Sequence, residues 1–448
     1  MILTKGGGSM DDDWIKCTVA DACSSIDYGL TASASDNPVG PRFLRITDIV
    51  QGHIVWDSVP YVEQNVGKKY RLHDGDIVLA RTGASTGASA YVKSPPPAVF
   101  ASYLVRLQAT PEFDALFLAY YLKSTYFLDF IHSILGDKSA QPNASASTMT
   151  KAPFCAPKDI KEQRRIAHIL GTLDDKIENN RKTAKTLEAM AQAIFKSWFV
   201  AFDPVRAKMA GESRESICKR LKLTPEILDL FPDRLVDSEL GEIPDGWEVG
   251  MLDNLAALVT DSTSPGRSPH TVFEHYSIPA FDAGRTPAME LGESIKSNKY
   301  VVKHRAVLVS KLNPHTPRIW LPANGDGAAI CSTEFMQFVP HEREDRPYLY
   351  CLMISQSMQE EVLKHVTGST GSRQRAQPSQ IAKVKILSPQ SCVKKVFTHQ
   401  ASPLLHAVAE NLTASRTLAA LRDALLPRLI SGEIRAADTH GCSKEILV

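Results

Sequence analysis

Basic and amide side chains gather in a few loop-like stretches of this 448-residue chain. From Tyr300 to Trp320 the sequence holds four lysines and arginines, two histidines and no acidic residue. From Thr367 to Lys385 it holds four lysines and arginines, three glutamines and again no acid. Arg, Lys, Asn and Gln carry the donors and acceptors that read base edges, and Ser, Thr and Lys suit phosphate oxygens. The chemistry that these stretches favour is nucleic-acid recognition.

Milder versions of the same stretches lie in the first half of the chain. They are "ARTGASTGASAYVK", starting at Ala80, and "GDKSAQPNAS", starting at Gly136. For any single residue an ordinary solvated loop is the alternative, but sets at matching places in both halves favour DNA contact. The candidate DNA-binding residues are Arg81, Thr82, Ser85, Thr86, Lys138, Gln141, Asn143, Lys311, Asn313, His315, Arg318, Arg373, Gln374, Arg375 and Gln377.

Recognisable signatures of catalysis are missing from the sequence. There is no Gly-rich dinucleotide loop, and "GASTG" lacks the lysine of a nucleotide phosphate loop. The histidines form no H-x-x-x-H pair and the eight scattered cysteines no C-x-x-C pair, so neither a metal site nor a disulfide framework is expected. We therefore predict a binding protein with no catalytic residues, no metal and no cofactor of its own.

The composition is that of a globular protein, with 43% hydrophobic and 23% charged residues. The 51 basic and 50 acidic residues give a net charge of +1, which excludes a uniformly basic nucleic-acid coat but not local basic patches. No apolar run approaches the roughly 18 residues that a membrane span needs. We expect a cytoplasmic protein with reduced thiols and no membrane partner.

The basic stretches belong to a plan that occurs twice. "WIKCTVADACSSI" from Trp14 matches "WEVGMLDNLAALV" from Trp247, and "DGDIVLARTGAST" matches "KHRAVLVSKLNPH". The offset between matching segments stays between 229 and 233 residues. Each copy begins with short β-like runs such as "DIVLA" and "RAVLVS" between turn-rich loops. An internal duplication of one domain is therefore predicted.

A helical pattern follows the β-like runs in each copy, near Phe113–Ile134 and Pro347–Val366, and then a polar loop leads into a long helix. The segment Ala201–Asp245 joins the copies and contains a short helix candidate at Pro225–Phe231. These elements must position the basic loops.

The long helix of the first copy, from Arg164 to Phe199, carries apolar residues at alternating spacings of four and three. This heptad pattern is typical of a helix that packs lengthwise on another helix. The expected partner is the equivalent helix of the second copy, in which Arg422 interrupts the stripe and Pro427 should kink or shorten the end. The helix-pairing residues we expect are Ile166, Leu170, Leu173, Ile177, Asn180, Leu187, Ile194, Val408, Asn411, Leu418 and Leu425.

Asn180 and Asn411 occupy the same heptad position, where a polar residue on an apolar seam fixes register or partner. Two surface asparagines are the alternative. Forty helical residues span roughly 60 Å, so the helix pair is interpreted as a spacer between two domains. Phe195, Trp198 and Phe199 are candidates for partner docking, or alternatively for packing under the chain's own domain.

The segments "KEQRRIAHILGTLDDKIENNRKTAKTLEAMAQAIFKSWFVAFDPVRAK" and "FPDRLVDSELGEIPDGWEVG" resemble the specificity subunit of type I restriction–modification enzymes. The resemblance covers the duplicated plan from Trp14 to Ile434. It implies a non-catalytic subunit that binds double-stranded DNA, two methyltransferase subunits and restriction/translocase subunits. S-adenosylmethionine and ATP with Mg²⁺ would then belong to those partners. It carries over no base-contacting residue, because recognition domains differ between members.

With this resemblance, the expected fold is α+β, with two similar target recognition domains joined by two long helices packed as an antiparallel intramolecular coiled coil. The expected divisions are 1–9, a possible linker or tag; 10–158, recognition domain 1; 159–200, the central helix; 201–245, a linker; 246–390, recognition domain 2; 391–436, the C-terminal helix; and 437–448, a tail. A single-chain DNA-modifying enzyme with an unrecognised site and a coiled-coil scaffold for proteins remain the alternatives.

Overall fold

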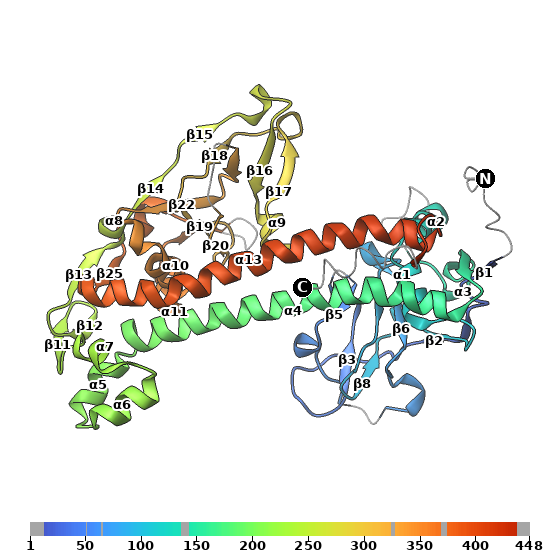
Figure 1. Ribbon diagram of the computed structural model, residues 1–448, viewed down its shortest axis with the longest axis horizontal. Coiled ribbons are helices and arrows are strands. Elements are labelled where there is room, and N and C mark those ends of the chain that lie inside the picture. Colours follow the sequence, from blue (N-terminus) through green and yellow to red (C-terminus); the bar gives the residue numbers. More distant parts are fainter. Residues whose placement is uncertain are drawn as a thin grey trace. The chain divides into compact units, whose positions relative to one another are not determined.

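The computed structural model describes residues 13–50, 52–63, 66–135, 143–323, 328–368 and 374–436. The chain divides into two units, Met1–Lys176 with Leu418–Val448, and Ile177–Thr417. Each unit combines a β-rich domain with part of two forty-residue helices, α4 (Ile160–Phe199) and α13 (Ser391–Ile430) (Figure 1). The predicted α+β fold with a pair of long helices is confirmed.

The β-rich domain of the first unit is built on a four-stranded antiparallel sheet in the order β2-β9-β6-β7. Its strand β6 is the predicted "DIVLA" run, and every residue of it is buried, as expected for the middle of a core. The first and last strands, β1 and β10, pair separately and antiparallel. The strands of this unit are β1 (Trp14–Thr18), β2 (Cys23–Tyr28), β3 (Arg42–Leu44), β4 (Ile49–Val50), β5 (His53–Ile54), β6 (Ile77–Ala80), β7 (Ser89–Tyr91), β8 (Ala98–Phe100), β9 (Leu104–Ala109) and β10 (Pro153–Pro157).

The second unit repeats this arrangement. Its sheet β14-β22-β19-β20 corresponds to the sheet of the first unit, and the antiparallel pair β13–β25 corresponds to β1–β10. The second unit also contains a separate five-stranded sheet in the order β15-β18-β21-β16-β17. The strands are β11 (Leu235–Ser238), β12 (Gly241–Pro244), β13 (Glu248–Met251), β14 (Ala256–Val259), β15 (Ser262–Thr263), β16 (Val272–Tyr276), β17 (Ala288–Leu291), β18 (Lys299–Val301), β19 (Val307–Ser310), β20 (Ile319–Trp320), β21 (Ala329–Cys331), β22 (Phe335–Pro340), β23 (Val366–Thr367), β24 (Arg375–Ala376) and β25 (Lys385–Ser388).

The helical pattern predicted after the strands is divided into two helices in each copy. In the second copy the break falls at Ser355, whose hydroxyl accepts from Met358 N and so caps the next helix. In the first copy it falls at Ser124, whose hydroxyl donates to Tyr121 O. The short helices are α1 (Ala115–Tyr121), α2 (Thr125–Leu135), α3 (Ala146–Met149), α8 (Leu252–Leu255), α9 (Ile278–Asp282), α10 (Arg346–Ile354), α11 (Gln356–Lys364) and α12 (Pro378–Ile381).

The joining segment holds α5 (Asp203–Met209), α6 (Arg214–Leu221) and α7 (Pro225–Asp229) before the β11–β12 hairpin. The sequence predicted only the last of these helices. The first two are only seven and eight residues long, and each begins at a local feature, a proline in the first turn of α5 and the Ser213 hydroxyl before α6.

In the first unit the beginning of α4 packs on the end of α13. Ile166 and Leu170 share one core cluster with Leu429 and Ile430. In the second unit the opposite ends meet, so that the two helices run antiparallel in both units. The expectation that Pro427 would shorten α13 is wrong: its missing N–H falls in the last turn, and the buried Leu429 and Ile430 hold that turn.

Arg422, which interrupts the apolar stripe of α13, is matched by an acid on α4. Its Nη1 lies 2.6 Å from Asp174 Oδ1, and Asp174 Oδ2 accepts from Tyr120 Oη at 2.7 Å. Asp174 is buried, and Arg422 remains partly exposed. A charge on the seam is tolerated because its partner is on the facing helix.

The aromatic residues at the end of α4 are buried inside the second unit. Phe195 and Trp198 are 2% exposed and Phe199 is 5% exposed. Phe199 makes edge-on ring contacts with Tyr348 and Phe397, at centroid distances of 5.1 and 5.2 Å. Their rings form part of the core of their own domain, which favours the alternative of packing under the chain's own domain over partner docking.

The start of each long helix is tied to the loop that precedes α1 or α10. In the first copy Gln163 Oε1 accepts from Asp114 N at 2.8 Å. At the equivalent positions of the second copy Lys394 Nζ donates to Asp345 Oδ2 at 2.7 Å. The amide and the ion pair are different chemistry for the same mechanical link.

Candidate nucleic-acid interface

The first candidate loop follows strand β6. Arg81 N donates to Tyr103 O, and the Arg81 carbonyl accepts from Ala144 N at 3.0 Å. Thr82 forms a β-bridge with Asn143, and Arg81 Nη2 donates to Asn143 Oδ1 at 3.2 Å. The fold thus brings together Arg81, Thr82 and Asn143, which lie some 60 residues apart in the sequence.

The second candidate loop follows strand β19, the counterpart of β6. Leu312 forms a β-bridge with Arg375, and the Lys311 carbonyl accepts from Ala376 N at 2.9 Å. Asn313 N donates to Gln374 O at 3.0 Å. Both copies therefore hold a basic loop against a second polar segment through the same pair of backbone contacts.

Asn313 is held in an unusual conformation at the tip of this loop. Its φ of 48° lies in the left-handed region, which asparagine tolerates better than most residues. Its side-chain Oδ1 is buried without a hydrogen-bond partner. His315, two residues further along the chain, is exposed.

Two arginines of the second copy are engaged by acids that the sequence pattern did not reveal. Arg375 pairs with Glu334 through Nε and Nη2, each 3.0 Å from a carboxylate oxygen, and this bond raises the pKa of Arg375. Arg318 pairs with Asp282 through Nε at 2.6 Å and Nη2 at 2.9 Å, and its side chain is only 12% exposed. A guanidinium with this fork occupied is a structural group, so the structure disfavours the DNA contact predicted for Arg318.

The remaining candidates differ in exposure. Ser85 and Gln377 are exposed, whereas Thr82, Thr86, Lys311 and Gln374 are partly buried. Thr86 Oγ1 donates to Gly83 O at 2.8 Å and so closes the turn of its own loop. Lys138, Gln141 and Arg373 lie outside the described residues.

Two tyrosines beside the first loop were missed by the sequence reasoning. The Arg81 guanidinium carbon lies 5.1 Å above the ring of Tyr28, which is 46% exposed. Tyr103, whose carbonyl receives Arg81 N, is 59% exposed. Exposed aromatic rings next to arginine are suited to contacts with bases or sugars. An isolated tyrosine in a turn-rich stretch gives no periodic signal by which to find it.

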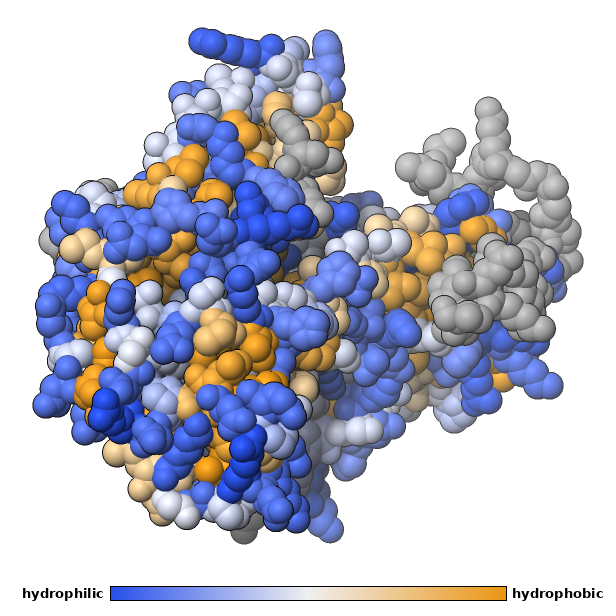
Figure 2. Space-filling model, turned by 60° about the vertical axis from the view of Figure 1, so that its left-hand side comes forward, coloured by the Kyte–Doolittle hydropathy of each residue, from blue (hydrophilic) through white to orange (hydrophobic). Residues whose placement is uncertain are grey.

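Among the described residues, no group of His, Cys, Asp or Glu is placed to hold a metal ion. Within the same ranges no helix has the length and apolar character to cross a membrane. On the face shown in Figure 2, hydrophilic side chains surround the apolar ones.

Comparison with known proteins places these loops in a family context. The family model described as Type I restriction modification DNA specificity domain matches residues 13–189. The chain is 24% identical over 475 residues to the type I restriction enzyme HindI specificity subunit of Haemophilus influenzae, covering 94% of this chain and 100% of that protein. It is 25% identical over 338 residues to the MjaIX specificity subunit of Methanocaldococcus jannaschii, covering 72% of this chain and 69% of that protein.

The fold is similar to that of a solved structure, the S subunit of a type I restriction-modification system from M. genitalium. The TM-score is 0.55 at 13% sequence identity, and the match covers 94% of this chain and 97% of that one. The likeness concerns the architecture, including the long helices and the β-rich domains.

Proposed function

The chain belongs to the specificity subunits of type I restriction–modification systems, the non-catalytic subunits of those complexes, and from this premise we propose that its two β-rich domains read the two halves of a split DNA target. The observation that carries the proposal is the repeated loop geometry. Arg81 and Asn143 in one copy, and Lys311 in the other, are presented by equivalent backbone pairs, and the residue that pairs with the Lys311 loop is Arg375, whose guanidinium is already bound to Glu334.

Each domain would place its loop pair in the major groove and read a half-site of a few base pairs. Half-site centres about one helical turn apart, roughly 34 Å, let both domains act from one face of the duplex. The α4–α13 pair would set the unread gap between the half-sites. The domains proposed for readout are residues 10–158 and 246–390, with the helices at 159–200 and 391–436.

The partners proposed for this chain are double-stranded DNA, two methyltransferase subunits and restriction/translocase subunits, in the cytoplasm. The methyltransferase subunits would bind S-adenosylmethionine and flip the target adenine out of the duplex. ATP and Mg²⁺ would serve the translocating subunits. This chain supplies positioning and sequence choice.

A change in helix length tests the spacer. Inserting seven residues after Lys182 in α4 and seven after Thr413 in α13 keeps the heptad faces and lengthens the pair by about 10 Å. At about 3.4 Å per base pair, the unread gap should grow by about three base pairs while both half-sites stay the same. The measurement is the map of methylated positions in genomic DNA from cells that carry the whole system.

A matched control inserts the same seven residues after Gly211, in the turn between α5 and α6. This variant should leave the gap unchanged. A gap that does not respond to the paired helix insertions would show that the helices are not the spacer.

A further inference from the structure

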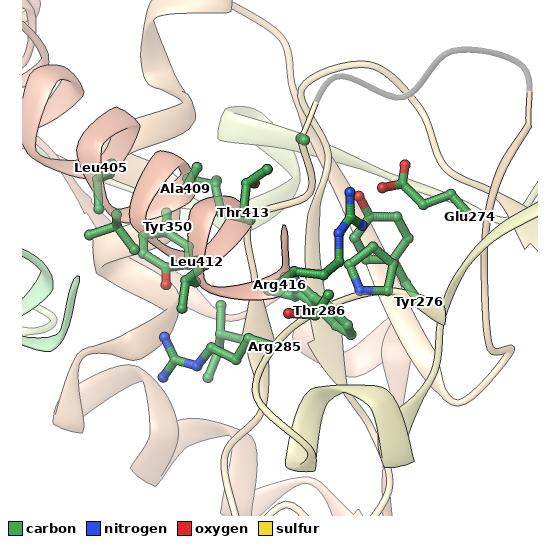
Figure 3. A pocket seen from close by; sticks show the side chains of 16 residues that line it. Glu274, Tyr276, Arg285, Thr286, Tyr350, Leu405, Ala409, Leu412, Thr413 and Arg416 are labelled. Atoms are coloured by element: carbon green, nitrogen blue, oxygen red, sulfur yellow. The ribbon is translucent and has the colours of Figure 1, made fainter. Parts of the chain in front are cut away.

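A hollow of about 890 Å³ lies between α13 and the second β-rich domain, within the second unit. It shares Leu405, Ala409 and Thr413 with the smaller neighbouring cavity drawn in Figure 3, where α13 forms one wall. The basic residues that line the hollow are His304, Arg305, Arg343, Arg346 and His406. Glu410 is the single acid among the lining residues, and it already lies 3.3 Å from His406 Nε2.

Two of these arginines have polar atoms with no partner. The Nε atoms of Arg305 and Arg346 are both buried and make no hydrogen bond. Arg346 Nη2 is anchored, because it donates to Ala306 O at 3.2 Å and also to Pro322 O. Arg305 is held at a φ of 69°, which a residue with a side chain adopts only when its surroundings impose it. The fold therefore anchors the Arg346 guanidinium and leaves the Nε atoms of both arginines unsatisfied.

Within the described residues neither arginine has a carboxylate within ion-pair distance. Arg318, Arg375 and Arg422, by contrast, each have one. Burial, with a smaller contribution from the neighbouring Arg305 guanidinium, lowers the pKa of Arg346 to about 10, although Tyr276 and Tyr350 oppose this shift. Partly buried like charges without a counter-charge are unfavourable unless an anion accompanies them.

We propose that this hollow, lined by the half-buried Arg305 and Arg346 and the exposed Arg343, binds a phosphate group. A tetrahedral phosphate can accept hydrogen bonds from several guanidinium groups at once, whereas a carboxylate has only two oxygens to share among them. The ligand is either a free phosphate compound or a phosphodiester of DNA. Both sources present the same oxyanion to the same donors.

This site is separate from the proposed reading loop. Arg305 precedes strand β19, whereas Lys311 and Asn313 follow it, so the two lie at opposite ends of that strand. The inference about free phosphate does not rest on the proposed function, and it can hold even if the base-reading loops are assigned wrongly.

The first experiment titrates inorganic phosphate into the purified full-length chain by isothermal calorimetry, at constant ionic strength against chloride. We expect saturable binding that Arg346→Gln and Arg305→Gln each weaken by roughly tenfold, since a hydrogen bond to a charged group is lost. Arg343→Gln, at an exposed position, serves as a milder variant that keeps the fold. Arg267→Gln, which removes an exposed charge elsewhere in the same unit, should leave the affinity unchanged.

The second experiment distinguishes the sources by measuring affinity for a duplex as a function of salt. If DNA supplies the phosphate, Arg305→Gln and Arg346→Gln should weaken binding to target and non-target duplexes alike and lower the salt slope by about one. If a free phosphate compound is the ligand, phosphate binding is lost and the DNA salt slope stays the same. The proposal is overturned if phosphate heats are absent or equal in all variants and the salt slope also does not change.

Discussion

Asp174→Asn tests whether the ion pair on the helix seam holds the first unit together. Asp174 accepts from Arg422 on the facing helix and from Tyr120 in the β-rich domain, at 2.6 and 2.7 Å. The carboxylate therefore links three elements, α1, α4 and α13. The substitution keeps the size of the side chain and removes its charge.

The expected loss follows from burial on each side of the pair. Removing one partner of a fully buried pair costs about 3–5 kcal/mol. Arg422 is 22% exposed and keeps its second contact with Asp423, 2.7 Å away, so the cost falls to about 2–3 kcal/mol. For a unit of this size each kcal/mol corresponds to about 2–4 °C in midpoint, and the first unit should melt about 5–10 °C lower.

Scanning calorimetry of the purified chain measures this, and the neighbouring residue supplies the control. Asp175 pairs with Lys93 at 2.7 Å, but both side chains are about two-thirds exposed, at 65% and 64%. Asp175→Asn should therefore change the midpoint by less than about 2 °C. Equal shifts in midpoint for the two substitutions would refute the claim that the Asp174 carboxylate stabilises the first unit more than an exposed ion pair does.

Acid provides a second assay of the same contact. Burial raises the pKa of Asp174, but Lys123, Arg422 and Tyr120 lower it, and their combined effect is the larger. The pKa of Asp174 is therefore below its ordinary value. A carboxyl with a depressed pKa contributes its stability above the unfolded-state value of about 3.9 and loses it as the pH falls through the folded-state value. The gap between wild type and Asp174→Asn should be full at pH 7 and should close below about pH 4. A gap that is constant down to pH 3 would mean that the charge is not responsible.

Two further substitutions test the corrected roles of individual residues. Trp198→Ala should destabilise the second unit of the purified chain by about 3–5 kcal/mol in the absence of any partner, because Trp198 packs against Phe231 and Phe397 in the core. A variant with normal stability but impaired complex assembly would instead support a docking role for Trp198. Lys311→Gln should weaken binding to all duplexes and lower the salt slope of DNA affinity by about one. Arg318→Gln should leave that slope unchanged, because Asp282 already binds the Arg318 guanidinium. Filter binding measures both slopes, and the opposite pattern would reverse the two assignments.

The duplication and most of the elements could be predicted from the sequence because their signals are periodic. Strands β6 and β19 are buried apolar runs, and they lie where "DIVLA" and "RAVLVS" predicted them. The long helix α4 could be predicted because its apolar residues recur at heptad spacing, which is typical of a helix packed lengthwise on another helix. The division of the helical patterns at Ser124 and Ser355 was missed because a single serine within an apolar run barely changes its periodicity.

The pairing of charges could not be predicted, since it depends on which residues the fold brings together. Arg318 and Asp282 lie 36 residues apart, and Arg422 and Asp174 lie 248 apart. The acid-free character of the loop sequence made Arg375 look available for DNA, but Glu334 reaches it from the turn before strand β22. An unpaired charge in sequence is therefore weaker support for binding than an unpaired charge in the folded chain.

The same reasoning separates the two kinds of basic residue in this molecule. Arg318, Arg375 and Arg422 each have a carboxylate, so removing the arginine leaves a stranded acid and mainly costs stability. Arg305 and Arg346 have none among the described residues. Removing Arg305 relieves its repulsion with Arg346 and should not lower the stability of the free chain, whereas removing Arg346 also gives up its hydrogen bonds to Ala306 O and Pro322 O. Two neighbouring arginines without a carboxylate cost electrostatic energy unless a ligand supplies the opposite charge. The second unit should therefore gain stability when phosphate is added, and Arg346→Gln should lose that gain.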